Sequence, residues 1–214
     1  MKLLKKDLNK EFKIVEIFRT VEGEGSWVGL PVVFIRLEGC NLRCPWCDTT
    51  YSYDGKSFKI LDLDQILNEI KKYNIKRVCI TGGEPFFTEN LDILVNFLLE
   101  NKYTVFIETN GTLFNENIDY NNKNLYIVCS PKPPSYFINP NLASYISEFK
   151  FVIDDFITLQ NIKEVIKFNK NIILQPQSNL PDKVKKAIDL QDKLLSFGIE
   201  SRVIPQCHKV LGLP

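Results

Sequence analysis

Three cysteines lie close together in one short segment, as Cys40, Cys44 and Cys47 in the spacing C-x-x-x-C-x-x-C. Three thiolates this close in sequence can hold one iron–sulfur cluster, but such a cluster usually takes four protein ligands. The missing ligand would leave one iron open to bind a reactive molecule, just as a catalytic zinc keeps an open position. A structural zinc site completed by Cys207 or His208 is the alternative that the cysteines alone leave open.

The elements that must position these thiols alternate between strands and helices along the chain. Apolar and alternating segments predict strands over residues 12–18, 31–37, 76–80, 103–108, 124–129, 149–153, 171–174 and 201–204. Amphipathic segments predict helices over residues 91–99, 159–168 and 182–197. A further helix is expected to begin near Asp62, which can cap the first turn together with Gln65 three residues later.

This alternation predicts a parallel sheet joined by right-handed crossovers, which places the chain in the α/β class. A full eightfold barrel takes ~250 residues, so about six core strands indicate an open, partial (β/α) barrel. The cysteine loop, residues 81–85 and residues 130–132 each directly follow a predicted strand. Because ligands bind at the carboxyl ends of parallel strands, we expect these segments to share one rim of the sheet.

Length and composition are those of an ordinary globular protein, with 214 residues, 44% hydrophobic and 25% charged. The net charge of +1 gives no electrostatic reason to expect nucleic acid binding. No apolar run approaches the ~18 residues of a membrane span, and residues 1–10 lack the apolar core of a signal peptide. We expect one domain over residues 1–214, with a lead-in at 1–11 and a tail at 205–214 that closes the pocket.

The six cysteines do not suggest a disulfide framework, because three crowd one loop and no secretory signal is visible. The expected environment is a reducing, cytoplasmic one. Cys79 and Cys129 lie in apolar strand-like segments and are expected to be small core residues.

The cysteine spacing, followed after the next strand by Gly82-Gly83-Glu84-Pro85, resembles the radical S-adenosylmethionine (SAM) superfamily. Residues 22–49, 108–112, 130–134 and 205–209 resemble the 7-carboxy-7-deazaguanine synthase family in particular. The resemblance runs from about residue 14 to the end of the chain. It implies a shortened radical-SAM core, with the cluster loop after an early strand.

The resemblance also implies an activity. The three thiolates would hold a 4Fe–4S cluster, and the amino and carboxylate groups of SAM would chelate the fourth iron. An electron from the cluster would release a 5′-deoxyadenosyl radical, so no side chain is implied as the catalytic group. The family contracts the ring of 6-carboxy-5,6,7,8-tetrahydropterin to 7-carboxy-7-deazaguanine with loss of ammonia, on the route to queuosine and other 7-deazapurines. SAM is reformed, Mg²⁺ assists, a flavodoxin- or ferredoxin-type protein supplies the electron, and the family suggests a homodimer.

Ligand contacts are implied at many positions, with Thr49 as the magnesium ligand. Contacts to SAM would come from Trp46, Asp48, Gly83, Glu84, Ser130, Lys132, Gln175, Gln177 and Ser178. Contacts to the substrate would come from Val21, Glu22, Gly23, Glu24, Arg36, Thr81, His208 and the terminal carboxylate of Pro214. A carboxylate such as Glu24 can accept two hydrogen bonds from the guanidine-like edge of a pterin, and Arg36 can pair the pterin carboxylate in a fork.

Several of these residues have simpler interpretations. Glu22 stands where the family commonly has glutamine. Asp48 and Thr49 could cap a turn, and Arg36 could form a surface salt bridge, although its strand is otherwise apolar. Residues 175–177 could be an ordinary strand exit. His208 is the only histidine of the chain, which excludes a multi-histidine metal site, and a lone histidine is more often structural.

Two alternatives remain for the protein as a whole. One is a radical-SAM activase that makes a glycyl radical on a partner protein. The other is an interaction module that binds zinc or an iron–sulfur cluster and catalyses nothing. The iron content and the cleavage of SAM distinguish these possibilities.

Overall fold

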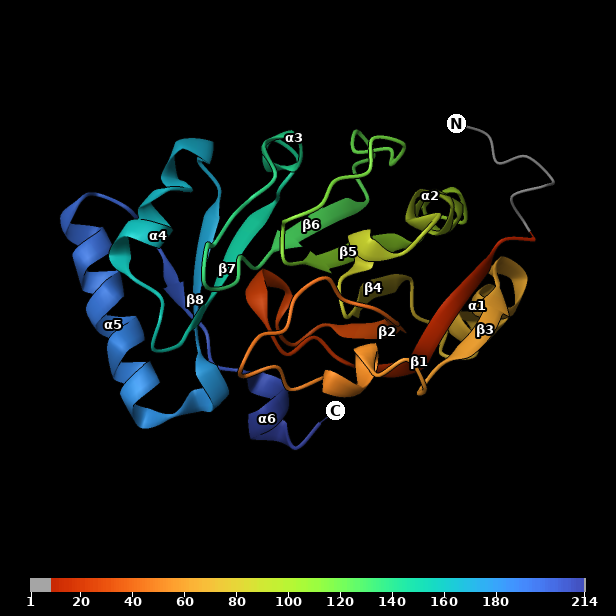
Figure 1. The fold of residues 1–214 in the computed structure, drawn as a ribbon, viewed down its shortest axis with the longest axis horizontal. Coiled ribbons are helices and arrows are strands. Elements are labelled where there is room, and N and C mark those ends of the chain that lie inside the picture. The colour runs from red at the N-terminus through yellow and green to blue at the C-terminus, as the bar shows by residue number, and fades with distance from the viewer. Residues whose placement is uncertain (1–8, 214) are drawn as a thin grey trace. The chain divides into compact units, whose positions relative to one another are not determined.

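The structure, a computed structural model, describes residues 9–213 and contains one open nine-stranded sheet (Figure 1). The strands are β1 (Glu11–Val21), β2 (Pro31–Leu37), β3 (Lys59–Asp62), β4 (Arg77–Gly82), β5 (Thr104–Thr109), β6 (Leu125–Cys129), β7 (Glu148–Ile153), β8 (Asn171–Pro176) and β9 (Arg202–Val203). Their order in the sheet is β3-β1-β2-β4-β5-β6-β7-β8-β9. The predicted α/β class with an open, mostly parallel sheet is confirmed.

The helices are α1 (Leu63–Lys71), α2 (Leu91–Glu100), α3 (Pro140–Ala143), α4 (Leu159–Lys163), α5 (Pro181–Ser196) and α6 (Cys207–Leu211). The chain divides into two compact units. The first unit contains residues up to 20, residues 31–109 and residues 113–127, and the second contains residues 21–30, residues 110–112 and the chain from residue 128 onward. The single-domain organisation expected from the sequence stays a prediction.

The first unit is built on parallel strands that are buried on both faces. β2 pairs with β4 in the register Val33–Val78, and β4 pairs with β5 in the register Val78–Val105. All three valines are fully buried, as expected for a central parallel strand. At the edge, β3 pairs antiparallel to β1, so the sheet is not parallel throughout.

Helix α1 begins as its sequence predicts. The Asp62 side chain accepts a hydrogen bond from the Gln65 backbone N–H at 2.8 Å, and the Gln65 side chain accepts one from the Asp62 N–H at 2.9 Å. This reciprocal capping box satisfies two backbone donors that the first helical turn leaves unpaired. The predicted helix start is therefore confirmed.

The second unit has a parallel core of its own. β7 pairs with β8 in the register Phe149–Ile172 and Phe151–Leu174, and these four side chains are buried. The long helix α5 packs along β7 and β8 (Figure 1). Because side chains alternate along a strand, the buried phenylalanines on one face of β7 place Glu148 and Lys150 on the other.

Some elements differ from the expectation. The helix expected over residues 159–168 is two short pieces, α4 and a 3₁₀ turn at Ile166–Phe168, and Asn169 ends the second piece with φ of 51°. β3, α3 and α6 were not predicted, because each is only four or five residues long.

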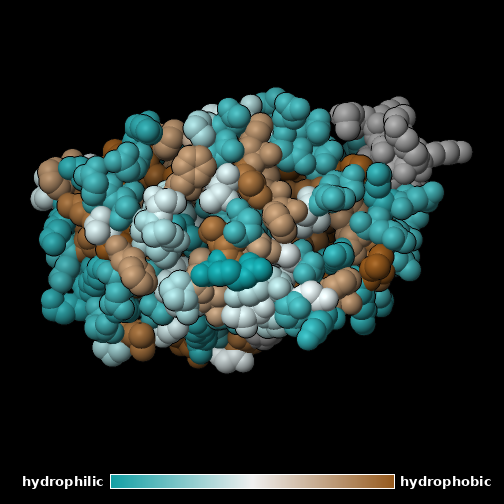
Figure 2. Space-filling view, viewed as in Figure 1, coloured by the Kyte–Doolittle hydropathy of each residue, from teal (hydrophilic) through white to brown (hydrophobic). Residues whose placement is uncertain are grey.

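No helix among residues 9–213 is both long enough and apolar enough to cross a bilayer. On the face drawn in Figure 2, hydrophilic residues predominate and hydrophobic ones occur in small groups.

Candidate functional site

The cysteine loop follows β2 in the first unit, as predicted. Cys40, Cys44 and Cys47 are free thiols that are neither fully buried nor fully exposed. The Cys47 N–H donates to the Cys44 carbonyl at 3.2 Å, and the Leu42 N–H lies 3.4 Å from the Cys40 sulfur. These bonds give the loop a defined backbone, and a backbone N–H directed at a sulfur is a common feature of iron–sulfur sites.

Gly83 brings the segment after β4 onto this loop. The Glu84 N–H donates to the Gly39 carbonyl at 2.8 Å, and the Gly83 N–H donates to the Leu37 carbonyl at 3.2 Å. A Cβ at position 83 would overlap the Gly39 carbonyl and lie 2.8 Å from the Cys40 Cβ. Only a residue without a side chain allows this approach, so Gly83 positions the cysteine loop through its backbone.

The environment of Cys40 favours the protonated thiol until a metal binds. Burial raises the pKa of this thiol, and the nearby Glu84, Cys44 and Cys47 raise it further, against the opposing N–H of Leu42. Metal binding must remove this proton. A set of three soft thiolates on one short loop suits iron–sulfur clusters and zinc better than magnesium or calcium.

Glu84, predicted to contact SAM, has buried partners within the first unit. Its side chain is 1% exposed, and its Oε1 accepts hydrogen bonds from the Thr109 hydroxyl at 2.6 Å and from the Phe86 N–H at 3.1 Å. Thr109, at the end of β5, is 3% exposed. The Glu84 side chain therefore joins the ends of β4 and β5.

Thr109→Val is expected to lower the free energy of unfolding by about 2 kcal/mol, because it removes a donor to a buried charged acceptor without changing the side-chain volume much. Thr104→Val is the matched control, because Thr104 lies on the same strand and is less buried. Its expected change is about 0.5 kcal/mol or less. Urea unfolding of both variants checks the difference, and equal changes would contradict the role given to the Thr109 hydroxyl.

Arg36 forms an ion pair within the first unit rather than pointing into solvent. Its Nε donates to Glu16 Oε1 at 2.7 Å, and the Tyr51 hydroxyl donates to the same oxygen at 3.0 Å. The Arg36 side chain is 11% exposed, and its Nη atoms have no hydrogen-bond partner in the described part of the chain. The register places Arg36 beside Thr81, so these two predicted substrate contacts share one face of the sheet.

A loop from Glu22 to Leu30 carries the predicted carboxylates in the second unit. It is closed by the Glu22 N–H on the Leu30 carbonyl and the Gly29 N–H on the Glu22 carbonyl, both at 2.8 Å. The Glu24 N–H donates to Glu22 Oε1 at 3.2 Å. Glu22 is 7% exposed, so the residue that replaces the family's glutamine is buried and binds the backbone of its own loop.

Glu24 has three partners in the same unit that the sequence did not suggest. Lys150 Nζ lies 2.5 Å from its Oε2, Gln206 Nε2 donates to Oε1 at 2.9 Å, and His208 Nδ1 lies 3.8 Å from Oε1. Burial by itself would raise the pKa of Glu24, but Lys150, Gln206 and His208 together hold it at about 2. Glu24 is therefore a fixed anion at neutral pH.

The tail of the chain packs on the same loop. The Cys207 N–H donates to the Gly23 carbonyl at 2.9 Å, and a Cβ on Gly23 would lie 2.6 Å from His208 Nδ1. Gly23 and His208, both predicted substrate contacts, are thus adjacent. Val21 lies half-buried at the end of β1, and Pro214 lies outside the described residues.

The predicted SAM contacts of the second unit follow β6 and β8. Gln175 is fully buried, yet neither atom of its amide has a hydrogen-bond partner in the described part of the chain. An unsatisfied buried amide is costly, which favours a ligand that binds it. Ser178, with φ of 51°, donates its N–H to Gln206, and Lys132 Nζ lies 2.7 Å from the Ser130 hydroxyl. Gln177 is partly exposed.

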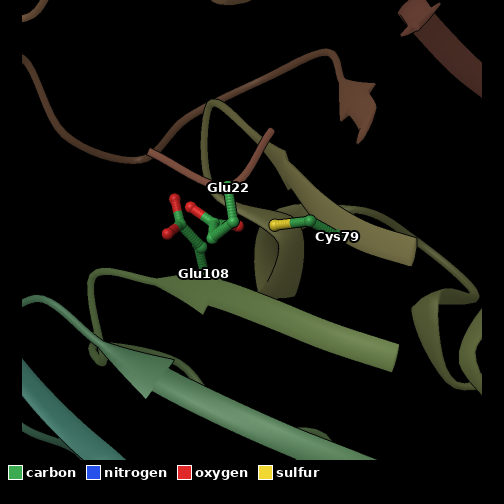
Figure 3. Close-up of side chains that lie close together, drawn as sticks. All are labelled: Glu22, Cys79 and Glu108. Atoms are coloured by element: carbon green, nitrogen blue, oxygen red, sulfur yellow. The ribbon is translucent and has the colours of Figure 1, made fainter. Parts of the chain in front are cut away.

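The remaining predicted residues lie on the cysteine loop. Trp46 and Thr49 are half-buried, Asp48 is exposed, and the Thr49 hydroxyl lies 3.7 Å from the Cys47 sulfur. Thr49 makes no cap through its side chain at the following 3₁₀ turn. Cys79 and Cys129 are fully buried, which confirms them as core residues. Figure 3 shows Cys79 on β4 and Glu108 on the neighbouring β5; the third side chain it labels, Glu22, belongs to the second unit.

Comparisons with known proteins relate this chain to a superfamily, to named relatives and to a solved structure. The Radical SAM superfamily model matches residues 34–127. A 7-carboxy-7-deazaguanine synthase of Aquifex aeolicus is 43% identical over 205 residues, which cover 92% of each chain. One of Rickettsia prowazekii is 36% identical and covers 95% of this chain and 89% of the relative. The crystal structure of QueE from Escherichia coli has the same fold, with a TM-score of 0.74 and 24% identity over 92% of this chain and 95% of that one.

Proposed function

The chain belongs to the 7-carboxy-7-deazaguanine synthase family, and from this premise we propose that it contracts the ring of 6-carboxy-5,6,7,8-tetrahydropterin to 7-carboxy-7-deazaguanine. Ammonia is lost, and the product feeds the biosynthesis of queuosine or another 7-deazapurine. The observation that carries the proposal is the loop held against Gly83, because this one loop offers a cluster three thiol ligands.

The residues of the first unit fit a 4Fe–4S cluster. Cys40, Cys44 and Cys47 would be its ligands, and the Leu42 N–H would remain directed at the Cys40 sulfur. The half-buried Trp46 would shield the cluster from solvent. When bound, cluster and SAM together supply a 5′-deoxyadenosyl radical for hydrogen abstraction, so the chain's own residues bind, orient and exclude water.

Proposed contacts to SAM are described for each unit by itself. In the first unit, the backbone of Gly83 and Glu84 lies against the cysteine loop and Asp48 is exposed beside it. In the second unit, the unsatisfied amide of Gln175 is the clearest indication of a polar ligand. The other proposed contacts to SAM are Ser130, Lys132, Gln177 and Ser178.

The substrate is assigned by charge. A pterin presents N–H donors on its guanidine-like edge and an acceptor on its carboxylate. Glu24 is a fixed anion that can accept hydrogen bonds from the N–H donors of the guanidine-like edge. The Nη atoms of Arg36 can donate hydrogen bonds to the pterin carboxylate. Thr81, Val21, Glu22, Gly23 and His208 complete the proposed set of substrate contacts.

Magnesium is assigned to the Thr49 hydroxyl with oxygen atoms of the substrate carboxylate and water, because Mg²⁺ prefers hard oxygen ligands and keeps several waters. A flavodoxin- or ferredoxin-type protein would deliver the electron, and the functional form would be a homodimer. A reducing, cytoplasmic environment suits six free cysteines.

The curated relatives do not favour the alternative of a glycyl-radical activase, since those compared are named 7-carboxy-7-deazaguanine synthase. A pterin carboxylate is also a suitable partner for Arg36, and a protein backbone substrate carries no such group. Turnover of the pterin in the assay below would reject the alternative of an interaction module.

The test is an anaerobic assay with the carboxytetrahydropterin, SAM, Mg²⁺ and a reductant. The wild type is expected to carry about four irons and to form 7-carboxy-7-deazaguanine. Cys44→Ser is expected to lose the cluster and form no detectable product, because thiolates are the ligands that iron–sulfur clusters take. Cys207→Ser is the control, since Cys207 is a ligand only in the zinc alternative, and it is expected to keep the wild-type iron content.

Stoichiometric zinc without iron in the wild type would reject the radical-SAM assignment. Cleavage of SAM without formation of 7-carboxy-7-deazaguanine would keep the superfamily and reject the substrate.

A further inference from the structure

Strand β7 carries two buried residues of opposite charge at alternate positions. Glu148 and Lys150 are each 3% exposed and lie on the same face of the strand. Phe149 and Phe151 alternate with them and are buried in the core. Buried charges are rare unless they are paired, so both require partners on that face.

Both residues find a partner in the loop from Glu22 to Leu30. The Ser26 N–H donates to the Glu148 carboxylate, at 3.1 and 3.2 Å from its two oxygens. Gly25 has φ of 63°, and a Cβ there would overlap Glu148 Oε1. Glu148 therefore fixes the backbone directly after Glu24, while Lys150 binds the Glu24 side chain at 2.5 Å.

The partners of Glu24 leave its carboxylate able to accept more hydrogen bonds. Oε2 lies against Lys150, and Oε1 accepts from Gln206. An ionised carboxylate has about four acceptor positions on its two oxygens, so these contacts do not exhaust it. Its side chain remains 19% exposed, whereas that of Lys150 is only 4% exposed. Lys150 is thus screened by the protein and Glu24 is the member of the pair that a ligand can reach.

We propose that Lys150 is a positioning residue for substrate recognition, which keeps Glu24 charged and aimed so that its carboxylate accepts hydrogen bonds from the guanidine-like edge of the pterin. The inference rests on the proposed function. It adds to that function a residue that does not touch the substrate and acts through Glu24. Burial opposes the charged form of Glu24, and the Lys150 ammonium is the strongest of the groups that favour it.

The groups that face Glu24 determine how the loss of Lys150 should change the pKa of Glu24. They are Lys150 from β7, Gln206 and His208 from the tail, and Glu22 from the same loop. Without Lys150, burial raises the pKa of Glu24 against Gln206 and His208 alone. A protonated Glu24 then becomes a poorer acceptor, so the substrate should bind less well as the pH falls.

The experiment compares wild type, Lys150→Met and Lys150→Arg as cluster-loaded protein with SAM. The equilibrium Kd of the carboxytetrahydropterin is measured anaerobically from about pH 5.5 to about pH 8.5. For Lys150→Met, the ratio of its Kd to that of wild type is expected to be about tenfold or more at the acidic end and smaller at the alkaline end. Titration of the free pterin is common to both proteins, so it cancels in the ratio.

Lys150→Arg is expected to restore binding to within about threefold of wild type, because a guanidinium also supplies the charge. The Kd for SAM should not change in either variant. Lys183→Met is the matched control: Lys183 on α5 is 7% exposed in the same unit, and it pairs with Asp155 and with Asp182 of its own helix rather than with Glu24. It should leave the pterin Kd within about twofold of wild type.

A double variant keeps the inference testable if Lys150→Met does not fold. Glu24→Gln/Lys150→Met removes both charges together and leaves no uncompensated buried ion, so it should fold where the single variant is unstable. It is expected to bind the pterin weakly at every pH. Wild-type Kd values in folded Lys150→Met at all pH values, or wild-type binding by the double variant, would overturn the inference. Failure of the wild type to bind the pterin would overturn the proposed function instead, and with it the substrate named here.

Discussion

Gly83→Ala is expected to lower the free energy of unfolding by about 3 kcal/mol and to reduce the bound iron several-fold. The new methyl group would overlap the Gly39 carbonyl and approach the Cys40 Cβ to 2.8 Å. Both neighbours belong to the backbone or to the first atom of a side chain, so neither can rotate away. Relief requires the two segments to separate, which moves Cys40 and breaks the hydrogen bond from the Glu84 N–H to Gly39.

Gly55→Ala is the matched control for this substitution. Gly55 has φ of 72°, but a Cβ there would meet nothing within 4 Å. Its expected cost is the backbone strain alone, about 1–2 kcal/mol, with wild-type iron content. Iron analysis after anaerobic loading and urea unfolding measure the two effects. Full iron loading of Gly83→Ala would show that the close approach of the two segments does not position the cysteine loop.

The sequence predicted most of the central strands because a strand buried on both faces is a nearly continuous apolar run. Val33 and Ile35 in β2 and Val78 and Ile80 in β4 are all fully buried. The start of α1 could also be predicted from the sequence, since Asp62 and Gln65 have the spacing of a capping box. α6 was not predicted because its five residues contain less than two helical turns, and β3 was not predicted because its four residues do not alternate between apolar and polar side chains.

The cysteine loop and Gly83 were singled out from residue type and spacing in the sequence. The side chains that bind the carboxylate of Glu24 were not. Lys150 and Glu148 stand in an otherwise apolar strand, the same signal that singled out Arg36. A charge in such a strand indicates a buried partner but does not name it. Lys150 and Glu24 are 126 residues apart, so only the fold shows that they meet.

The partner of Arg36 could not be identified from the sequence either. Its place in β2 indicated a role other than a surface salt bridge. In the structure, Arg36 Nε donates a hydrogen bond to Glu16, and the Nη atoms can donate to another acceptor. Glu16 lies 20 residues earlier, on β1, where alternation alone cannot tell which exposed acid faces the arginine. The charged residues themselves were therefore visible in the sequence, whereas the partner of each one required the fold, and their contacts to a substrate stay predictions.

Glu24→Gln is expected to cost about 3 kcal/mol of unfolding free energy at neutral pH, and this cost should disappear in acid. The pKa of Glu24 falls from an ordinary value of 4.5 to about 2 in the folded protein. A depressed carboxyl pKa stabilises the fold above the unfolded value and loses that contribution as the pH falls toward the folded value. The stabilisation is thus complete above about pH 5.5, and about two-thirds of it is lost by about pH 3.

The difference between wild type and Glu24→Gln isolates this group from all other titrating carboxylates. At low pH the protonated glutamic acid and the glutamine are both neutral and nearly equal in size, so the two proteins should converge. Urea unfolding of the cluster-free protein at about pH 7 and about pH 3 measures the convergence without interference from metal loss. Glu69→Gln is the control, because Glu69 is 43% exposed and pairs with Lys72 on the surface of α1. Its effect should stay within about 0.5 kcal/mol at both pH values. A cost of Glu24→Gln that is the same at both would mean that Lys150 and Gln206 do not hold Glu24 in its charged form.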